Sequence, residues 1–486
     1  MASLTKKIIR GKPYYYLRQS KRVNGKPKIV STIYLGSPQR LVDRLLRPAP
    51  AQVALAEFGA SAAVFALAQA LEVVATIDRH VPKRGAQGPS VGEYLLVAAL
   101  NRCIAPCSKA QIGDWYAKTA LRRLRPLAAG QLTSQRFWDN MARVTPEHIA
   151  AIEHDLARTA VARFGLDLRC LLFDATNFFT FLDSFNERAT LPQRGHSKEG
   201  RDNLRLLGLA LLVTSDGEVP LFHHTYAGNQ HDAVTFKSVA EALLARCRAL
   251  TQGASDITLV FDKGNNSADT LAIVGASPVH FVGSLVPTQH RDLLGIARKA
   301  MRRLDTTQLP AVWAYRTRKV VFGVEHTILC TFNHELFEAQ TRTLAREIRK
   351  RKRKLQKLQT RLQRRQPGSR GKAPTVEGVQ QQVKEILRGR HMLALFTVTV
   401  RQSRHRLPRL SFRFRETAYR HLAATLLGKT LIFTDRTDWS DEQIVLAYRA
   451  QHHVEANFRR LKDPHYLTFR PTFHWTDQKL RVHAFY

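Results

Sequence analysis

Three acidic residues lie where carboxylates could hold a hard metal ion. Asp174 follows the apolar run 170–173, Asp262 follows the apolar run 257–261, and Glu455 lies in a segment with helical periodicity. Mg²⁺ prefers a few carboxylates from the protein together with water and phosphate oxygens. Two such ions roughly 4 Å apart promote phosphodiester cleavage by activating the attacking oxygen and stabilising the leaving oxygen. Each acid also has a simpler interpretation. Asp174 and Asp262 could each merely end a strand, and Glu455 could form an ion pair with Arg459 on a helix surface.

The elements that must position these acids form an α/β pattern. Strands are predicted at 168–173, 206–213, 218–226, 257–261, 279–286 and 430–435, and a helix at 233–250. This alternation predicts a mixed sheet with helices on its faces. Ser440 is expected to cap a helix that runs to about Lys462. On that helix one face carries Ile444, Tyr448, Gln451, Glu455 and Lys462.

Two further regions precede the predicted catalytic core. Residues 1–50 contain a small basic β-meander at 5–36, with turns at Gly11–Pro13 and Asn24–Gly25. Its interleaved Lys, Arg and Tyr suit contact with DNA, although an ordinary amphipathic sheet would show the same pattern. Residues 51–165 read as an all-helical DNA-binding region, in which Thr145 and Pro146 begin a helix.

The predicted core is itself interrupted. We assign 166–286 to its first part, 287–428 to an α+β insertion domain, and 429–486 to its last strand and Glu-bearing helix. The insertion is predicted to contain strands at 312–322, 325–332, 392–402 and 407–415 and helices at 335–365 and 375–389. The longer helix has an apolar seam that the shorter helix can cover. The seam consists of Leu344, Ile348, Leu355, Leu358 and Leu362, and the covering face of Val376, Val379, Val383 and Ile386.

The large positive net charge of the chain favours a polyanionic partner. The 486 residues include 76 Lys and Arg against 39 Asp and Glu, a net charge of +37, which indicates nucleic acid. No apolar run reaches the roughly 18 residues of a membrane span, so we expect no membrane. The five cysteines suggest no disulfide framework, and we expect a cytoplasmic protein.

Basic residues are densest in the long helix of the insertion. Between Gln340 and Lys372 there are 14 Lys or Arg and one acid, Glu347. The uninterrupted run is Arg349, Lys350, Arg351, Lys352, Arg353 and Lys354, and we expect it to contact DNA phosphates. A solvated helix face is the alternative.

Residues 448–462 resemble the signature helix of insertion-sequence transposases of the insertion-sequence-four type. That signature is Tyr, two residues, Arg, three residues, Glu, six residues, Lys. Tyr448, Glu455 and Lys462 match it, but Gln451 stands where Arg is expected. Arg449 and Arg459 are near enough to share the role of that Arg. Similar stretches occur at Asp174–Thr176, Gly195–Lys198, Gly228–Asp232 and Arg470–Trp475.

The resemblance implies a DDE-type transposase with a ribonuclease-H-like core. Asp174 would bridge two Mg²⁺ ions, for which Mn²⁺ could substitute, and Asp262 and Glu455 would each complete one ion. Tyr448 and Lys462 would hold a phosphate at the transposon end. The partners would be terminal inverted repeats and target DNA, bound by a homodimer at the bacterial nucleoid. A hairpin DNA intermediate would use a stacking aromatic, for which Trp313 and Trp439 are the candidates.

Two alternatives stay open, a nuclease on the same core without transposition and an inactive DNA-binding remnant. Relatives of this type continue past Tyr486 with further apolar helix. We therefore expect Leu480, Val482 and Phe485 to be poorly buried and the flank formed by Val454, Phe458 and Leu461 to lack cover. On this expectation the chain is truncated, binds DNA and catalyses poorly.

Overall fold

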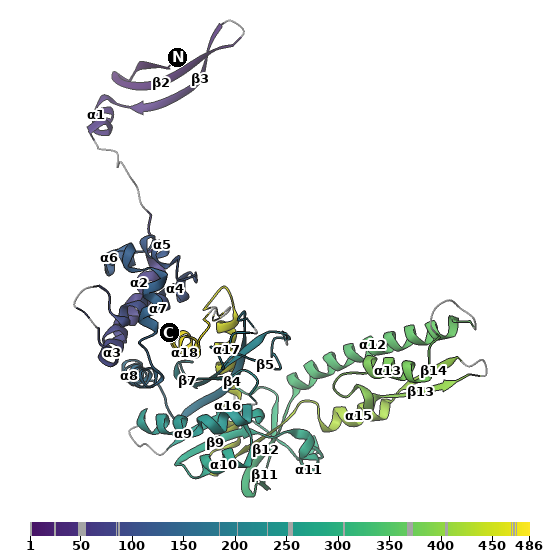
Figure 1. Ribbon diagram of the computed structural model, residues 1–486. Coiled ribbons are helices and arrows are strands. Elements are labelled where there is room, and N and C mark those ends of the chain that lie inside the picture. The colour runs from purple at the N-terminus through teal and green to yellow at the C-terminus, as the bar shows by residue number, and fades with distance from the viewer. Residues whose placement is uncertain are drawn as a thin grey trace. The chain divides into compact units, whose positions relative to one another are not determined.

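The chain divides into two compact units, Met1–Glu57 and Phe58–Tyr486, each with its own sheet (Figure 1). The computed structural model describes residues 2–23, 26–46, 55–83, 85, 88–183, 185–201, 203–230, 232–250, 256–304, 307–366, 373–403, 407–467, 469, 472 and 474–486.

The first unit is an antiparallel meander followed by one helix. It contains β1 (Ala2–Ile9), β2 (Lys12–Val23), β3 (Lys26–Gly36) and α1 (Pro38–Leu46). The predicted β-meander is therefore confirmed, and the turn at Gly11 has the positive φ of 76° that glycine accommodates. The predicted turn at Asn24–Gly25 lies outside the described residues.

Helices open the second unit, as the sequence predicts. They are α2 (Gly59–Ala70), α3 (Val73–His80), α4 (Val91–Ile104), α5 (Ile112–Ala117), α6 (Leu121–Leu124), η1 (Ala129–Gln131), α7 (Ser134–Met141) and α8 (Pro146–Phe164). Thr145 caps α8 by accepting a hydrogen bond from the His148 backbone, and Pro146 occupies the first helical position. Across the described residues no single helix is long and apolar enough to span a membrane, although α2 and α3, bent by 51°, meet that test as a pair.

A ten-stranded mixed sheet forms the centre of the described part of this unit. Its strands are β4 (Cys170–Thr180), β5 (Gln193–Arg194), β6 (Arg205–Thr214), β7 (Pro220–Ala227), β8 (Ile257–Phe261), β9 (Val279–Ser284), β10 (Arg302–Arg303), β11 (Val312–Val321), β12 (Val324–Asn333) and β15 (Lys429–Thr434). The order is β10-β11-β12-β15-β9-β8-β4-β6-β5, with β7 also paired to β6. Strands β4, β8 and β9 are parallel neighbours, and the other pairings are antiparallel.

Helices cover both faces of the sheet. One apolar core joins the sheet to residues of α9 (Asp232–Leu250), α10 (Ala268–Gly275) and α11 (Arg291–Leu294). The core on the opposite face joins it to α16 (Asp441–Arg449), α17 (Gln451–Lys462) and α18 (Asp477–Phe485). Short turns η2 (Lys263–Asn265), η3 (Pro287–Gln289) and η4 (Arg298–Ala300) connect these elements.

Two details of the predicted core are wrong. Strand β4 does not end before Asp174 but continues to Thr180, because residues 175–180 also pair with β6. Strands β11 and β12, which we assigned to the insertion, belong to the central sheet, where β12 pairs with β15.

An α+β lobe leaves the sheet after β12 and returns to it at β15 (Figure 1). It contains α12 (His334–Arg364), α13 (Val376–Ile386), α14 (Met392–Leu395), β13 (Phe396–Gln402), β14 (Pro408–Phe414) and α15 (Glu416–Thr425). The five apolar seam residues of α12 are buried, and Val379 and Val383 of α13 pack in the same core. The predicted seam is confirmed.

The expectation of an uncovered C-terminal segment is wrong. Leu480 and Val482 of α18 are 0% exposed. Leu480 packs in the same core as Val454 and Phe458, so this flank of α17 is covered. Val482 packs in the helical region with residues of α3, α4 and α8. The loss of burial energy that we expected at this segment therefore does not occur.

Candidate functional site

Asp174 of β4 and Asp262, which directly follows the neighbouring parallel strand β8, lie side by side. Phe173 of β4 is paired with Phe261 of β8, so the residues that follow them are adjacent as well. Neighbouring strands are about 4.8 Å apart, and residues in register point to the same face. Both carboxylates are half-buried. The sheet thus brings two of the three predicted metal ligands together.

Two hydroxyl groups hold the Asp262 carboxylate. Ser284, the last residue of β9, donates to Asp262 Oδ1 at 3.0 Å, and Tyr448 of α16 donates to the same oxygen at 3.4 Å. Burial, and then the charge of Asp262, raise the pKa of Tyr448 to about 12. Its hydroxyl therefore remains a donor at neutral pH. Sequence reasoning placed Tyr448 at a phosphate and missed Ser284, whose only signal was its position near the end of the predicted strand 279–286.

The helix that carries Glu455 is broken at one point. Ser440 caps it as predicted, accepting from the Gln443 backbone at 3.2 Å, but the helix divides at Ala450 into α16 and α17. After the break, α17 runs along β4: Gln451 Nε2 donates to the Phe173 carbonyl at 3.3 Å. Further along the same face, Lys462 Nζ donates to Thr176 Oγ1 at 2.8 Å.

Glu455 lies between these two contacts on the face of α17 that they define. It is exposed, and its charge contributes to the raised pKa of Tyr448. Within the described residues, no three His, Cys, Asp or Glu side chains are arranged to hold a metal ion. The structure therefore places Glu455 on the face of α17 that contacts β4, without joining it to Asp174 and Asp262. The two adjacent aspartates still fit Mg²⁺, which takes few protein ligands and prefers carboxylate oxygens.

Lys462 lies among further charged side chains. Its Nζ lies 3.7 Å from Glu199 Oε1, and the neighbouring Lys198 donates to the Ala175 carbonyl at 2.7 Å. Burial and then the Lys198 charge lower the pKa of Lys462 to about 8, against the opposing effect of Asp174. Glu199 was missed by sequence reasoning, although it directly follows the Gly195–Lys198 stretch that carried part of the resemblance.

The remaining predicted DNA contacts of this helix have different surroundings. Gln451 is buried against β4, Arg449 is half-buried, and Arg459 is exposed. Burial lowers the pKa of Arg449. Of these three, Arg459 is the side chain most accessible to a phosphate.

Both candidate stacking aromatics already contact arginine. The Arg298 guanidinium lies 4.3 Å from the centre of the Trp313 ring, and that of Arg436 lies 4.7 Å from the Trp439 ring. Both tryptophans are half-buried against the cores of the sheet. A base would have to displace these arginines to stack on the same ring face.

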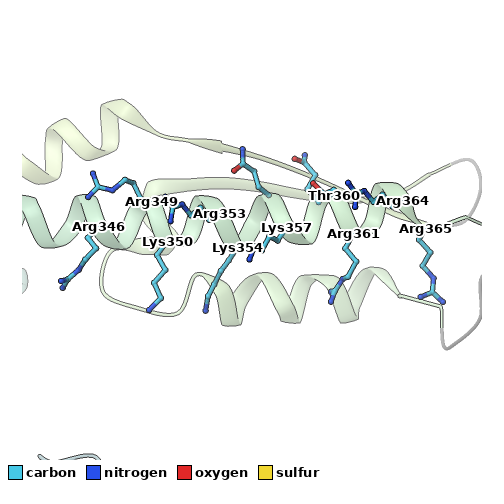
Figure 2. Close-up of a pocket in the computed structure, with 12 residues that line it drawn as sticks. Arg346, Arg349, Lys350, Arg353, Lys354, Lys357, Thr360, Arg361, Arg364 and Arg365 are labelled. Carbon is cyan, nitrogen blue, oxygen red and sulfur yellow. The ribbon is translucent and has the colours of Figure 1, made fainter.

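The basic run of α12 divides between two sides of the helix. Arg351 forms an ion pair with Glu347 and donates to the Arg388 carbonyl at 2.9 Å, and Lys352 lies 4.4 Å from the centre of the Phe414 ring. The other four cations of the run line an open groove of about 1150 Å³. We call this surface the basic groove (Figure 2). It is lined by Arg346, Arg349, Lys350, Arg353, Lys354, Gln356, Lys357, Gln359, Thr360, Arg361, Arg364 and Arg365.

Comparisons with known proteins give limited similarity. No protein-family model and no curated protein matches the chain. Among solved structures, the chain is similar to the piggyBac transposase synaptic complex with hairpin DNA, at 8% identity and a TM-score of 0.35, covering 85% of this chain and 71% of that one. It also matches a Mos1 transposase paired-end complex with the left transposon end, at 10% identity and a TM-score of 0.16, covering 40% of this chain and 59% of that one. TM-scores this low do not establish a common fold.

Proposed function

We propose that this protein is a DDE-type DNA transposase that cleaves transposon ends and joins them to target DNA. The observation that carries the proposal is the register of β4 and β8, which sets Asp174 beside Asp262 under the Glu455-bearing helix. The mixed sheet with helices on both faces is consistent with a ribonuclease-H-like core. The signature resemblance of residues 448–462 adds the assignment to the insertion-sequence-four type.

In this proposal the protein's own residues position the DNA and the metal ligands. Asp174 and Asp262 would hold Mg²⁺, and Glu455 would complete the site. When bound, two such ions supply charge stabilisation at the attacking and leaving oxygens. Ser284 and Tyr448 fix Oδ1 of Asp262, and Oδ2, which lies 3.8 Å from the Lys263 ammonium group, would bind the metal in place of that ion pair. Lys462 would hold a phosphate beside Asp174, and its contact with Thr176 fixes the position of its ammonium group.

The proposal extends to partners and location. The substrates would be terminal inverted repeats and target DNA, and pairing two ends would require a homodimer at the bacterial nucleoid. The net charge of +37 supports a nucleic-acid partner.

A cleavage assay on the full chain tests the proposal. The substrate is a supercoiled plasmid that carries the DNA flanking the gene, and nicking, linear product and joined product are measured with Mg²⁺ and with EDTA. We expect Asp174→Asn, Asp262→Asn and Glu455→Gln each to lower cleavage by on the order of 10² or more, because each removes charge stabilisation from the transition state. Asp269→Asn is the matched control, since Asp269 of α10 is an exposed acid that pairs with Lys237 of α9.

The products separate the competing functions. Mg²⁺-dependent cleavage followed by joining supports a transposase, whereas cleavage without joining indicates a nuclease on the same core. DNA binding without cleavage in the unaltered chain would indicate a catalytically inactive DNA-binding protein. If Glu455→Gln cleaves at the parent rate, Glu455 is not a ligand.

A further inference from the structure

The basic groove lies on the part of α12 outside its apolar seam. With 100° between successive residues, Leu344, Ile348, Leu355, Leu358 and Leu362 gather on one narrow face, and the groove-lining residues occupy the rest of the helix circumference. Arg351 lies within the seam face and Lys352 on its flank, and both contact other parts of the lobe. The groove-lining residues therefore follow most of the length of α12 rather than a short stretch of sequence.

Cations dominate the lining of this face. Of the twelve described lining residues, nine are Lys or Arg and the others are Gln356, Gln359 and Thr360. Figure 2 shows Arg346, Lys350, Lys354, Arg361 and Arg365 extending to one side of α12, toward α13. Arg361 also donates to Gln382 Oε1 of α13, which ties this side to the rest of the lobe. A surface so rich in one charge is costly without an anionic partner.

The length of the groove fits a duplex. From Arg346 to Arg364 the helix rises about 27 Å, at 1.5 Å per residue. Double-stranded DNA has one phosphate charge per about 1.7 Å of its axis, and 3.4 Å per base pair. The groove therefore spans about eight base pairs and can meet several phosphates at once.

The lining chemistry disfavours the other modes of nucleic-acid binding. Binding of a single strand relies on aromatic side chains that stack on bases, and none of the described lining residues is aromatic. Reading of base edges needs side chains held in fixed directions. Lys350, Arg353, Lys354 and Lys357 are exposed instead, and flexible exposed cations suit phosphates, whose contacts carry no sequence information.

We propose that the basic groove binds the phosphate backbone of double-stranded DNA without reading its sequence. The inference deepens the proposed function and rests on it in one respect, that DNA is the substrate. The lobe would thereby hold flanking or target DNA, while residues near Asp174 act on the transposon end. Arg351 and Lys352 take no part, because their side chains contact the lobe itself.

Salt-dependent binding by the full chain tests this inference. Dissociation constants are measured in EDTA between about 50 and 200 mM salt, for two unrelated duplexes of about 30 base pairs and for a single strand of equal length. The groove variant changes Lys350, Arg353, Lys354 and Lys357 to Gln. The matched control changes four exposed cations of the same lobe outside the groove, Lys384, Arg401, Arg409 and Arg413, to Gln.

We expect the groove variant to flatten the plot of log affinity against log salt by up to about 3.6, or 0.9 for each phosphate that is no longer neutralised, equally for both duplexes. The control should keep a slope near that of the unaltered chain. An equal loss in the control would overturn the inference in favour of diffuse charge. An unequal loss between the duplexes would indicate base reading, and a greater loss on the single strand would indicate single-strand binding.

The test also separates this inference from the proposed function. Because binding is measured in EDTA, it requires no cleavage, and Asp174→Asn should bind like the unaltered chain. A flattened slope in a chain that never cleaves DNA would leave the groove inference standing and remove the transposase assignment. If the unaltered chain cleaves DNA normally and the groove variant keeps an unchanged slope, the transposase assignment stands and the groove inference fails.

Discussion

The carboxylate site and the basic groove are built in opposite ways. Asp174 and Asp262 are far apart in the sequence and lie side by side only through strand register, and Glu455 is placed on the face of α17 that runs along β4. The groove arises from one helix, whose period of 3.6 residues separates cations from apolar residues. Changes at the first site should therefore act on single atoms with large effects. Changes in the groove should act in graded steps, because its cations are numerous and similar.

The largest difference between the two regions is expected for Leu355→Ala, which should impair the lobe and its DNA binding but not cleavage at the carboxylate site. Leu355 is 0% exposed in the core of the lobe, and truncating such a residue costs about 2–5 kcal/mol through reduced burial and the cavity left behind. We expect lower stability in denaturant unfolding and weaker duplex binding, because α12 would be held less firmly. Cleavage of DNA already bound at saturating concentration should persist, since the cores around the sheet are separate clusters.

The matched control is Leu393→Ala, because Leu393 lies in the same lobe but is 64% exposed. It should leave stability and binding nearly unchanged. If Leu355→Ala abolishes cleavage even at saturating DNA, the two regions are coupled and the contrast between them fails.

Ser284→Ala should produce the next largest effect, confined to the carboxylate site. The Ser284 hydroxyl positions Asp262 through a 3.0 Å hydrogen bond to a charged group. Such bonds contribute about 1.5–3 kcal/mol, so cleavage should fall roughly 10- to 100-fold. Because Asp262 would rotate more freely, the Mg²⁺ concentration for half-maximal cleavage should rise. Binding to duplex DNA in EDTA should not change.

Ser284→Thr keeps the hydroxyl and should restore most of the activity. A positioning role requires the shift in Mg²⁺ dependence. Loss of stability with an unchanged Mg²⁺ dependence would show that Ser284 supports only the sheet.

The same contrast explains what the sequence could predict. The predicted helix 335–365 agrees with α12 to within one residue at each end, and all five predicted seam residues are buried. Both predictions succeed because helical periodicity is a local property of the sequence. Strand pairing between segments that are distant in the sequence could not be predicted from local periodicity. The extension of β4 beyond Asp174 depends on its pairing with β6, and the placement of β11 and β12 depends on pairing with β15.

The functional site shows this limit residue by residue. The two aspartates were predicted because each follows a short apolar run, which is a local signal. The contact of Tyr448 with Asp262 and the role of Ser284 depend on how β9 and α16 pack beside β8, which no spacing reveals. The burial of Leu480 and Val482 likewise depends on surfaces supplied by distant helices and by the sheet.

The smallest effect should be a pH dependence of DNA binding that arises from Lys462. Its pKa is lowered from 10.5 to about 8, first by burial and then by Lys198. Above pH 8 the free protein carries a neutral Lys462, which must take up a proton to pair with a phosphate. Affinity for the plasmid's flanking DNA should therefore decrease by up to about tenfold per pH unit as pH rises above 8. Lys462→Arg should remove this decrease, because a guanidinium group stays charged, and the groove variant should retain it.

The effect of Lys462 on stability has the opposite sign to its effect on affinity. Because the folded-state pKa lies below the unfolded value, the unfolded chain binds more protons between pH 8 and about 10.5. The Lys462 contribution to stability therefore increases with pH across this window, while its contribution to binding decreases. Measuring binding and thermal unfolding on the same samples distinguishes the two. If Lys462→Arg shows the same decrease in affinity as the unaltered chain, the titrating group is another residue, and Lys462 does not hold a phosphate.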